Sequence, residues 1–333
     1  AGQYYDEEVF DQAGGAIYTD GRTIITHSMF DANIGTQAGG AIFNTKYGLL
    51  TVEDSQFIQN NADKGGALYY AADYENAPMG SINPLPQFAS APNTKQDDNH
   101  YKPLRQIEPY QKRILVFNST FEENSANQGG AIYNGLWSTL VVQASLFTRN
   151  EAIAEGGAIF NDADTLVIQS TFVENHADKG GALYGGYSAN NTFIRNHADT
   201  QGGAVSYGAI YYSTFVDNTA PEGGAVYSTQ LTASIIVGTM PQCDGQYLDN
   251  DNIITNTPCG DVIVIDDVGL GEFDGRVVPL LPDSPAIDVI DEPCGNFYTY
   301  NFLVEMNDDQ LGIARPQGDG CDLGAVEFVP DEP

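Results

Sequence analysis

Short runs in which apolar and polar residues alternate recur along most of the chain. Examples are the Ser-x-Phe triplets and the Leu-x-Val or Leu-x-Ile triplets that begin at Leu50, Leu140 and Leu166. Alternation with a period of two predicts short β-strands, and the Gly, Asn and Asp clusters between the runs predict turns. An apolar stripe with the period of a helix does not continue for three turns. The pattern therefore predicts an all-β protein.

The strands belong to a repeat that ends in Gly-Gly-Ala and an aliphatic residue. Seven of the eight Gly-Gly pairs that precede an alanine follow a Phe-x-x-Asn motif, whose Asn lies five or six residues before the first glycine. The phenylalanines are Phe30, Phe57, Phe121, Phe147, Phe172, Phe193 and Phe215, and the asparagines are Asn33, Asn60, Asn124, Asn150, Asn175, Asn196 and Asn218. Successive pairs lie 21 to 27 residues apart, except for one interval of 64.

A unit of this length with about three short strands corresponds to one coil of a parallel β-helix, whose coils stack about 4.8 Å apart. A leucine-rich repeat would need its own leucine pattern, and a propeller blade needs about 40 residues. We therefore predict a β-helix of about ten coils. It occupies residues 1–240 with a loop insertion at 71–113, and residues 241–333 form the last coils and an irregular, disulfide-containing capping module.

Stacked coils place each repeated residue above its counterpart. The phenylalanines are expected to stack in the core, where each ring contributes roughly 2 to 3 kcal/mol. The asparagines are expected at an inward corner, where their amides hydrogen-bond along the stack. Each Gly-Gly pair marks a bend that needs a positive φ or leaves no room for a Cβ. The motif thus predicts a scaffold and not an active centre.

Two family resemblances extend this interpretation. The repeats between about residues 10 and 240 resemble those of polymorphic outer-membrane and related bacterial surface proteins, which implies a single-stranded, right-handed parallel β-helix. The segments GLGEFDGRVVPLLPDSPAIDV and DQLGIARPQGDGCDLGAVEF resemble the closing module of bacterial secreted proteins called choice-of-anchor Q. That resemblance falls on Ser284, Pro285, Ala286, Ile287, Asp288, Arg315, Pro316, Gln317, Gly318, Cys321, Asp322, Gly324, Ala325 and Glu327.

The cysteines indicate an oxidising compartment. All four, Cys243, Cys259, Cys294 and Cys321, lie in the last third of the chain without a Cys-x-x-Cys pair. Such a set predicts two disulfides in an extracellular or cell-surface protein. Pairing in sequence order is preferred among three possible connectivities. The chain also begins at Ala1 without a methionine, as expected for a processed secreted protein.

The charge restricts the partners. Forty-five acidic and thirteen basic residues give a net charge of −32, which argues against nucleic acid or an anionic membrane because phosphate binding requires clustered Lys and Arg. The longest apolar stretches are too short to span a bilayer. We expect an acidic surface that keeps an extracellular protein soluble, with divalent cations as an addition.

The insertion at residues 71–113 contains six of the sixteen prolines, and proline at this density cannot continue a β-ladder. It also holds five of the thirteen basic residues: Lys95, Lys102, Arg105, Lys112 and Arg113. Two interpretations are open. The insertion docks on the acidic face of a neighbouring copy, or it is a surface excursion without a partner.

No cofactor is required by the sequence, but two metal sites are candidates. His176 and His197 occupy equivalent repeat positions, as do Asp178 and Asp199, so stacking would align them as ligands for zinc or another transition metal. The alternative is a solvated ridge. Further along, Asp244, Asp249 and Asp251 offer closely spaced carboxylates suited to calcium, with unliganded surface acids as the alternative.

The favoured function is that of a non-enzymatic extracellular or cell-surface structural protein. It would act in adhesion, in a matrix or in filaments formed by head-to-tail stacking, with other copies or cell-surface and matrix glycans as partners. The alternative is a carbohydrate-active enzyme, a polysaccharide lyase or glycosidase. A lyase needs aligned cations and a glycosidase paired carboxylates. Lys64 and Lys179 recur before Gly-Gly, but in non-adjacent coils.

Overall fold

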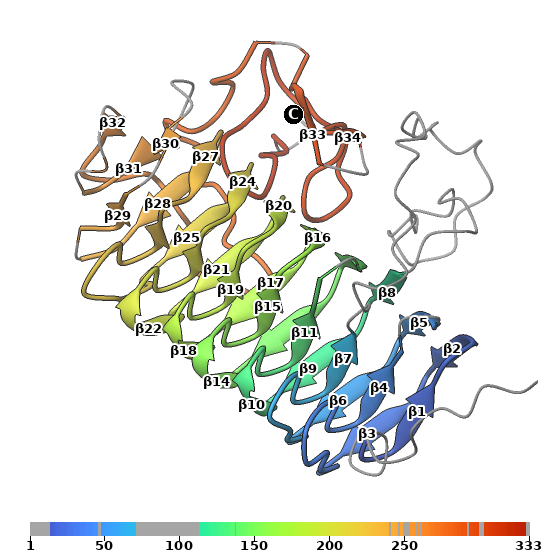
Figure 1. Cartoon of the computed structure of the whole chain (residues 1–333). Helices are drawn as coiled ribbons and strands as arrows, with labels where there is room; N and C mark the ends of the chain where they lie inside the picture. The colour runs from blue at the N-terminus through green and yellow to red at the C-terminus, as the bar shows by residue number, and fades with distance from the viewer. Residues whose placement is uncertain are drawn as a thin grey trace, which may run out of the picture.

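A computed structural model describes residues 14–45, 48–70, 113–136, 138–239, 241–245, 247–248, 254–257, 259, 262–291, 293–299 and 303–330. These residues form strands and turns, with no α-helix among them. Three long sheets wind around one axis (Figure 1), and every pairing within them is parallel. The predicted all-β parallel β-helix is confirmed.

Each coil contributes one strand to each long sheet. The first sheet contains β1 (Ile17–Thr19), β4 (Ile42–Asn44), β7 (Leu68–Tyr70), β11 (Ile132–Asn134), β15 (Ile159–Asn161), β19 (Leu183–Tyr184), β23 (Val205–Ser206), β26 (Val226–Tyr227) and β29 (Cys243–Asp244). The second contains β2 (Arg22–Thr26), β5 (Leu49–Glu53), β8 (Arg113–Phe117), β12 (Thr139–Gln143), β16 (Asp164–Ile168), β20 (Tyr187–Ala189), β24 (Ala209–Tyr211), β27 (Gln230–Thr232) and β30 (Tyr247–Leu248).

The third sheet contains β3 (Met29–Asp31), β6 (Gln56–Ile58), β9 (Thr120–Glu122), β13 (Leu146–Thr148), β17 (Thr171–Val173), β21 (Thr192–Ile194), β25 (Thr214–Val216), β28 (Ile235–Val237), β31 (Ile254–Thr255) and β32 (Ile263–Val264). A short sheet contains β10 (Ser125–Gln128), β14 (Glu151–Glu155), β18 (His176–Lys179) and β22 (His197–Gln201), and β33 (Asn296–Tyr298) pairs antiparallel with β34 (Leu303–Glu305). Two long sheets have nine strands and one has ten. The described residues therefore form nine complete coils, slightly fewer than the ten expected.

The phenylalanines of the repeat form one internal column. Six of them are completely buried, and Phe30, in the first described coil, packs against the core from its edge. Neighbouring ring centroids lie 4.7 to 5.0 Å apart with nearly parallel planes. Because the third sheet pairs each Phe with the next, for example Phe147 with Phe172, the spacing of the rings follows the spacing of the strands.

The asparagines form a buried hydrogen-bonded column beside the rings. Asn150 Oδ1 accepts hydrogen bonds from the backbone N–H and the side-chain amide of Asn124, at 3.1 and 2.9 Å. Its own Nδ2 donates to the carbonyl oxygen of Phe121 at 2.9 Å and to Asn175 Oδ1 at 3.0 Å. Each amide thus satisfies backbone groups of the neighbouring coils, so the turn can be buried without unpaired polar atoms.

The two glycines of each pair serve different purposes. Gly180 has a φ of +62°, in the left-handed region that favours glycine. Gly181 has an ordinary φ, but a Cβ there would lie 2.1 Å from the carbonyl oxygen of Gly203 in the next coil. The sequence left two explanations open for the glycine pair, a positive φ or a lack of room for a Cβ. The first holds for Gly180 and the second for Gly181.

The C-terminal region packs along one flank of the coils (Figure 1). Gln310 Nε2 donates to Thr171 Oγ1 at 2.9 Å, and the Phe297 ring stacks on Tyr211 with centroids 4.0 Å apart. One apolar cluster joins coil and module residues, namely Val141, Leu166, Ile235, Val277, Leu280 and Leu323. The two predicted disulfides are present and link Cys243 with Cys259 and Cys294 with Cys321. The first disulfide joins two segments of the last coils, and the second joins two segments of the module.

Arg113 differs from its expected role as a partner contact. It is the first residue of β8, pairs with Thr139 and is buried. Its side chain is therefore part of the coil and is not accessible to another molecule, so that expectation is wrong. The other basic residues of the insertion lie outside the described residues, namely Lys95, Lys102, Arg105 and Lys112.

Candidate functional site

The short sheet forms a fourth face of the coil. Each of its strands has a buried alanine in second place: Ala126, Ala152, Ala177 and Ala198. Alternation along a strand then directs the flanking residues outward. The residues before the alanines, together with their counterparts in adjacent coils, form one column of Ile34, Asn61, Ser125, Glu151, His176, His197 and Thr219. We refer to these seven residues as the outer column.

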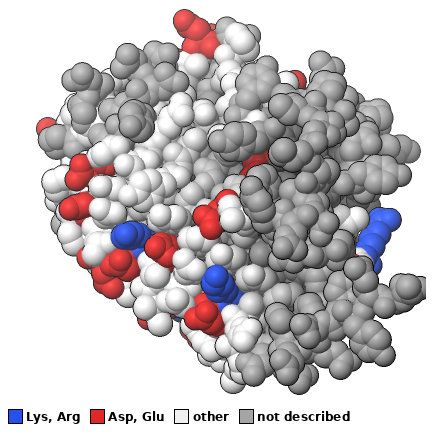
Figure 2. Space-filling view, viewed as in Figure 1, with Lys and Arg blue, Asp and Glu red and all other residues white. Residues whose placement is uncertain are grey.

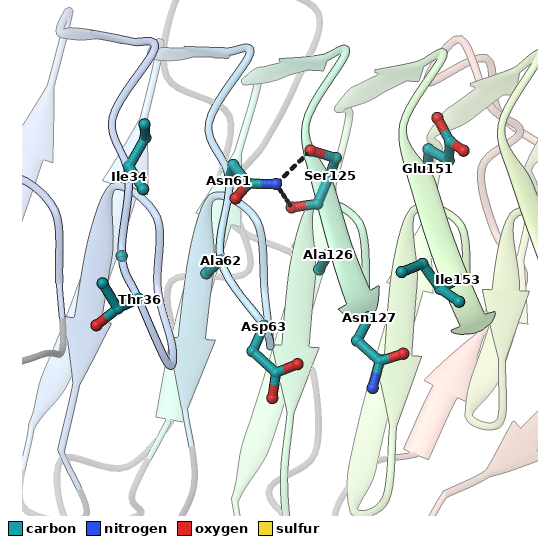
Figure 3. Close-up of a pocket in the computed structure, with 11 residues that line it drawn as sticks. Ile34, Thr36, Asn61, Ala62, Asp63, Ser125, Ala126, Asn127, Glu151 and Ile153 are labelled. Atoms are coloured by element: carbon teal, nitrogen blue, oxygen red, sulfur yellow. Dashed lines mark hydrogen bonds between the residues drawn. The ribbon is translucent and has the colours of Figure 1, made fainter.

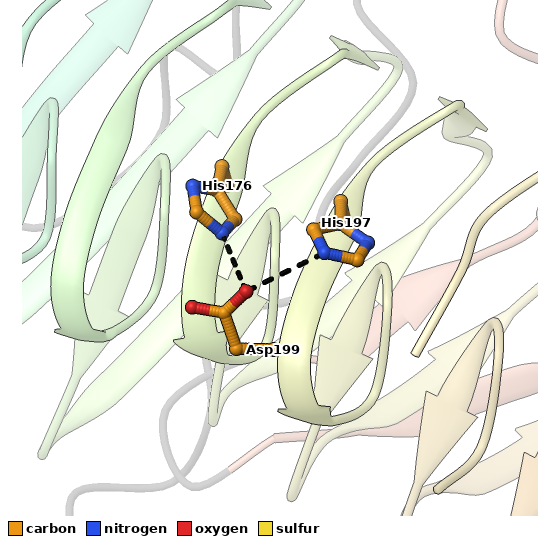
Figure 4. A group of neighbouring side chains, drawn as sticks. All are labelled: His176, His197 and Asp199. Carbon is orange, nitrogen blue, oxygen red and sulfur yellow. Dashed lines mark hydrogen bonds and ion pairs between the residues drawn. The ribbon is translucent and has the colours of Figure 1, made fainter. Parts of the chain in front are cut away.

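Two histidines and a carboxylate meet on this face (Figure 4). His176 lies opposite His197 in the parallel pairing of β18 and β22, and their rings stack with centroids 5.2 Å apart. Asp199 Oδ1 lies 3.1 Å from His176 Nε2 and 3.5 Å from His197 Nε2. The ligand atoms of the three residues all lie within 4.8 Å of one another.

The other half of the outer column lines an open groove of 510 Å³ (Figure 3). Asn61 Nδ2 donates to Ser125 Oγ of the adjacent coil at 2.7 Å. The lining includes the carboxylates of Asp63 and Glu151 and no basic residue. Within the described residues, this groove therefore lacks the cation that a polysaccharide lyase would need to neutralise a uronate.

A second aromatic ladder runs along the outer side of the first sheet. The members are Tyr18, Phe43, Tyr69, Tyr133, Phe160, Tyr184, Tyr207 and Tyr227. Ile42 and Ile132 point into the core, so the next residues along their strands point outward. From Tyr18 to Tyr184 the rings stack face to face, with interplanar angles of 5 to 21°. Within this stretch Tyr18 is 44% exposed, whereas Tyr133 and Phe160 are buried.

The ladder changes at Tyr207. Ser206 occupies the position of the expected aromatic residue, and the Tyr207 ring is tilted by 59° from Tyr184 and by 76° from Tyr227. It is 47% exposed. Gln201 Nε2 donates to Glu222 Oε2 nearby, at 2.8 Å. Burial first, and then the ionisable groups of Tyr207, Glu222 and Asp244, raise the pKa of Tyr227. The exposed Tyr207 ring thus lies beside Tyr227, whose surroundings include the Gln201 amide and the Glu222 and Asp244 carboxylates.

Charged side chains on the coil surface are interspersed. Figure 2 shows basic groups that border acidic ones on the described part of the visible face. Arg149 pairs with Glu122 and Glu123 of the preceding coil, and Arg195 pairs with Glu174 at 2.9 Å. These exposed pairs contribute little stability individually. Because Arg149 and Arg195 each lie beside a glutamate, neither forms part of a basic patch.

A buried polar cluster lies at the centre of the C-terminal module. Arg315 Nη1 donates to Glu327 Oε2 at 2.7 Å, and neither side chain is exposed. Arg315 also donates to the carbonyl oxygens of Asp322 and Gly324, both at 2.8 Å. Burial raises the pKa of Glu327, and the Arg315 charge offsets part of that effect. The cluster holds the chain between residues 315 and 327 in place.

The predicted site residues divide into three groups. His176, His197 and Asp199 come together, whereas Asp178 is outside their group and its carbonyl oxygen accepts a hydrogen bond from Thr200. Asp244 is exposed in β29. Asp249 and Asp251 lie outside the described residues. The sequence interpretation missed the second aromatic ladder. A usable signal was present, because most repeats place an aromatic residue directly after Gly-Gly-Ala and one aliphatic residue.

Comparison with known proteins gives a match to a family repeat. Residues 118–135 match the Chlamydia polymorphic membrane protein repeat, the segment that contains β9, β10 and β11. Neither a curated protein nor a solved structure matches the chain. Among the described residues, no helix has the length and apolar character needed to cross a membrane. The match supports a β-helix of the polymorphic membrane protein type for this repeat.

Proposed function

We propose that the protein is a non-enzymatic extracellular surface protein, in which a rigid β-helix presents an adhesive site for glycans around Tyr207. The observation that carries this proposal is the role of the repeated residues. The phenylalanines, asparagines and glycines of the motif form buried columns that hold one coil on the next. The repeated residues thus have a structural role, and the repeat does not need a catalytic one to explain it.

Three further observations support a surface location. The matched repeat belongs to a family described as polymorphic membrane proteins. Two disulfides fit an oxidising compartment. Residues shared with the choice-of-anchor Q module, among them Arg315, Asp322 and Glu327, meet in one buried cluster, which supports the assignment of the C-terminal segment to that type of module.

Tyr207 has the chemistry of a sugar-binding residue. Sugar rings pack their C–H faces against aromatic faces and hydrogen-bond to planar amide and carboxylate groups. Tyr207 departs from the parallel stack, and Gln201 and Glu222 lie in the same part of the surface. The negative charge of the body favours neutral glycans over uronates.

A glycan array tests the proposal. We expect the chain to bind neutral glycans and Tyr207→Ala to weaken binding by about tenfold or more, which corresponds to about 1.4 kcal/mol. Tyr18→Ala is the matched control, since Tyr18 has a similar exposed fraction of 44% but lies at the other end of the ladder. Equal binding by Tyr207→Ala and the parent chain, or no binding to any glycan, would contradict the adhesive site. Release of unsaturated or reducing sugar would instead favour the enzyme alternative.

End-to-end assembly is the second candidate function, and the first described coil favours it. Ile24, Met29 and Ile34 are 59 to 69% exposed there. Among the described strands, β1, β2 and β3 each have a neighbour on one side only. An edge strand next to exposed apolar side chains is a surface on which another chain can add, and a head-to-tail contact of that kind extends into filaments.

A further inference from the structure

We propose that His176, His197 and Asp199 form a transition-metal site, with zinc as its preferred ion, that links two adjacent coils. The inference is independent of glycan binding. It begins with the register of the short sheet, where β18 and β22 pair in parallel with the two histidines opposite each other. Figure 4 shows both imidazoles on the same side of the ribbon, with the Asp199 carboxylate between them. Two imidazoles and a carboxylate form a common zinc ligand set.

The distances between the donor atoms suit a tetrahedral ion. Zinc lies about 2.0 to 2.2 Å from imidazole nitrogen and carboxylate oxygen, which places two tetrahedral ligand atoms about 3.3 to 3.5 Å apart. The separations between Asp199 Oδ1 and the two Nε2 atoms are 3.1 and 3.5 Å. All three ligand atoms lie within 4.8 Å of one another, so the imidazoles reach tetrahedral spacing around an ion by rotation of their side chains.

The second nitrogen of each imidazole faces an acceptor. His197 Nδ1 lies 2.9 Å from Thr219 Oγ1, and His176 Nδ1 lies 4.0 Å from Glu151 Oε1. Donation from His197 Nδ1–H to Thr219 Oγ1 leaves the lone pair of Nε2 for the metal, as is typical of zinc-bound histidine. The Glu151 carboxylate is beyond hydrogen-bonding distance of His176 Nδ1 but favours a proton on that nitrogen, which leaves His176 Nε2 for the metal in the same way. Both acceptors belong to the outer column, so the β-helix supplies ligands and supporting groups from four successive coils.

The scaffold holds this group in place. The residues that follow the histidines, Ala177 and Ala198, are completely buried, and those that precede them, Asn175 and Asn196, belong to the hydrogen-bonded asparagine column. Ligands on rigid strands lose little entropy on binding. The three side chains remain partly exposed, so a fourth position is open to water, and the net charge of −32 favours a cation.

Metal titration of the full chain tests this site. The protein, free of any affinity tag and stripped with a chelator, is titrated with Zn²⁺ by calorimetry and with Co²⁺ by visible absorption. We expect one ion per chain, and a tetrahedral Co²⁺ spectrum that Zn²⁺ abolishes. His197→Ala and Asp199→Asn should weaken binding by about 100-fold or more, and Thr219→Val by about tenfold, as for a group that supports a ligand. Zinc should also raise the Tm of the parent chain and not that of His197→Ala.

His27→Ala is the matched control. His27 also faces a carboxylate, with Nε2 3.5 Å from Asp54 Oδ2, but it lies on a different face and outside the His176 group. This variant should bind zinc like the parent chain. The far-ultraviolet circular dichroism of every variant confirms that the β-helix is intact. Zinc binding that is equal in the parent chain, His197→Ala and Asp199→Asn, or the absence of stoichiometric binding by the parent chain, would overturn the proposal.

Discussion

Gly181→Ala is expected to lower the free energy of unfolding by more than about 3 kcal/mol. The added methyl group would lie 2.1 Å from the carbonyl oxygen of Gly203 and 2.4 Å from that of His197. Both atoms belong to the backbone of the next coil, which is itself paired with the coil that follows it. Relief of the clash therefore requires neighbouring coils to separate, which breaks hydrogen bonds as well as core packing. Urea unfolding followed by circular dichroism measures the change.

Gly21→Ala is the control for this substitution. A Cβ at Gly21 would meet no atom within 4 Å, and its φ is not in the left-handed region. The change is expected to alter stability by less than about 1 kcal/mol, and to increase it if anything, because alanine reduces the entropy of the unfolded chain. If Gly181→Ala were as stable as Gly21→Ala, the close stacking of the Gly-Gly bends would be contradicted.

Arg315→Met is expected to destabilise the protein by about 3 to 5 kcal/mol. The substitution removes the only side-chain cation within hydrogen-bonding distance of the buried Glu327 carboxylate among the described contacts, and it also removes donors to the carbonyl oxygens of Asp322 and Gly324. An uncompensated buried charge is costlier than a lost hydrogen bond. Thermal unfolding should show the loss first in the module, as a lower Tm in near-ultraviolet circular dichroism.

Two further variants separate burial from charge. Arg315→Met combined with Glu327→Leu should be more stable than Arg315→Met alone, because the double variant leaves no buried carboxylate at residue 327. Arg149→Met removes a cation from an exposed pair with Glu122 and Glu123 and should cost less than about 1 kcal/mol. Equal effects of Arg149→Met and Arg315→Met would show that the module does not depend on its buried ion pair.

The scaffold could be predicted because its columns consist of identical residues. A Phe that recurs every 21 to 27 residues can return to the same position on the β-helix only if each interval makes one complete coil. The turns were harder to predict. Glu123, Arg149 and Glu174 have φ values of 52 to 55°, although none is a residue that normally signals this conformation. Each of these residues directly precedes an asparagine of the buried column, whose hydrogen bonds to neighbouring coils offset the cost of the left-handed backbone. These bonds form only between stacked coils, so local sequence does not reveal them.

The position of the C-terminal module also depended on tertiary contacts. Its apolar residues, such as Val277 and Leu323, lack a regular period in the sequence, and their partners are outward residues of the second and third sheets. Leu166 and Ile235, for example, belong to that shared cluster. Spacing alone did not indicate which flank they cover.

Part of the metal site followed from the repeat. The two histidines occupy equivalent repeat positions and do lie opposite each other. Asp178 and Asp199 also occupy equivalent positions, but only Asp199 reaches the histidines. The segment from Asn196 to Gly202 is one residue longer than that from Asn175 to Gly180. The extra residue produces a register shift between Ala177 and Lys179, where Asp178 lies. Asp199 therefore meets the histidines and Asp178 does not, a distinction that required the structure.

Distances between spin labels test the stacked registry most directly. Ala32, Glu174, Arg195 and Asp217 share one turn position, with φ values of 50 to 55°, and the third sheet places the last three residues four, five and six coils from Ala32. All four native cysteines are disulfide-bonded, so cysteines introduced at 32 and at 174, 195 or 217 can be labelled. Pulsed electron resonance should give backbone separations of about 19, 24 and 29 Å, in equal steps of one strand spacing. Separations that do not increase in equal steps would contradict the β-helix.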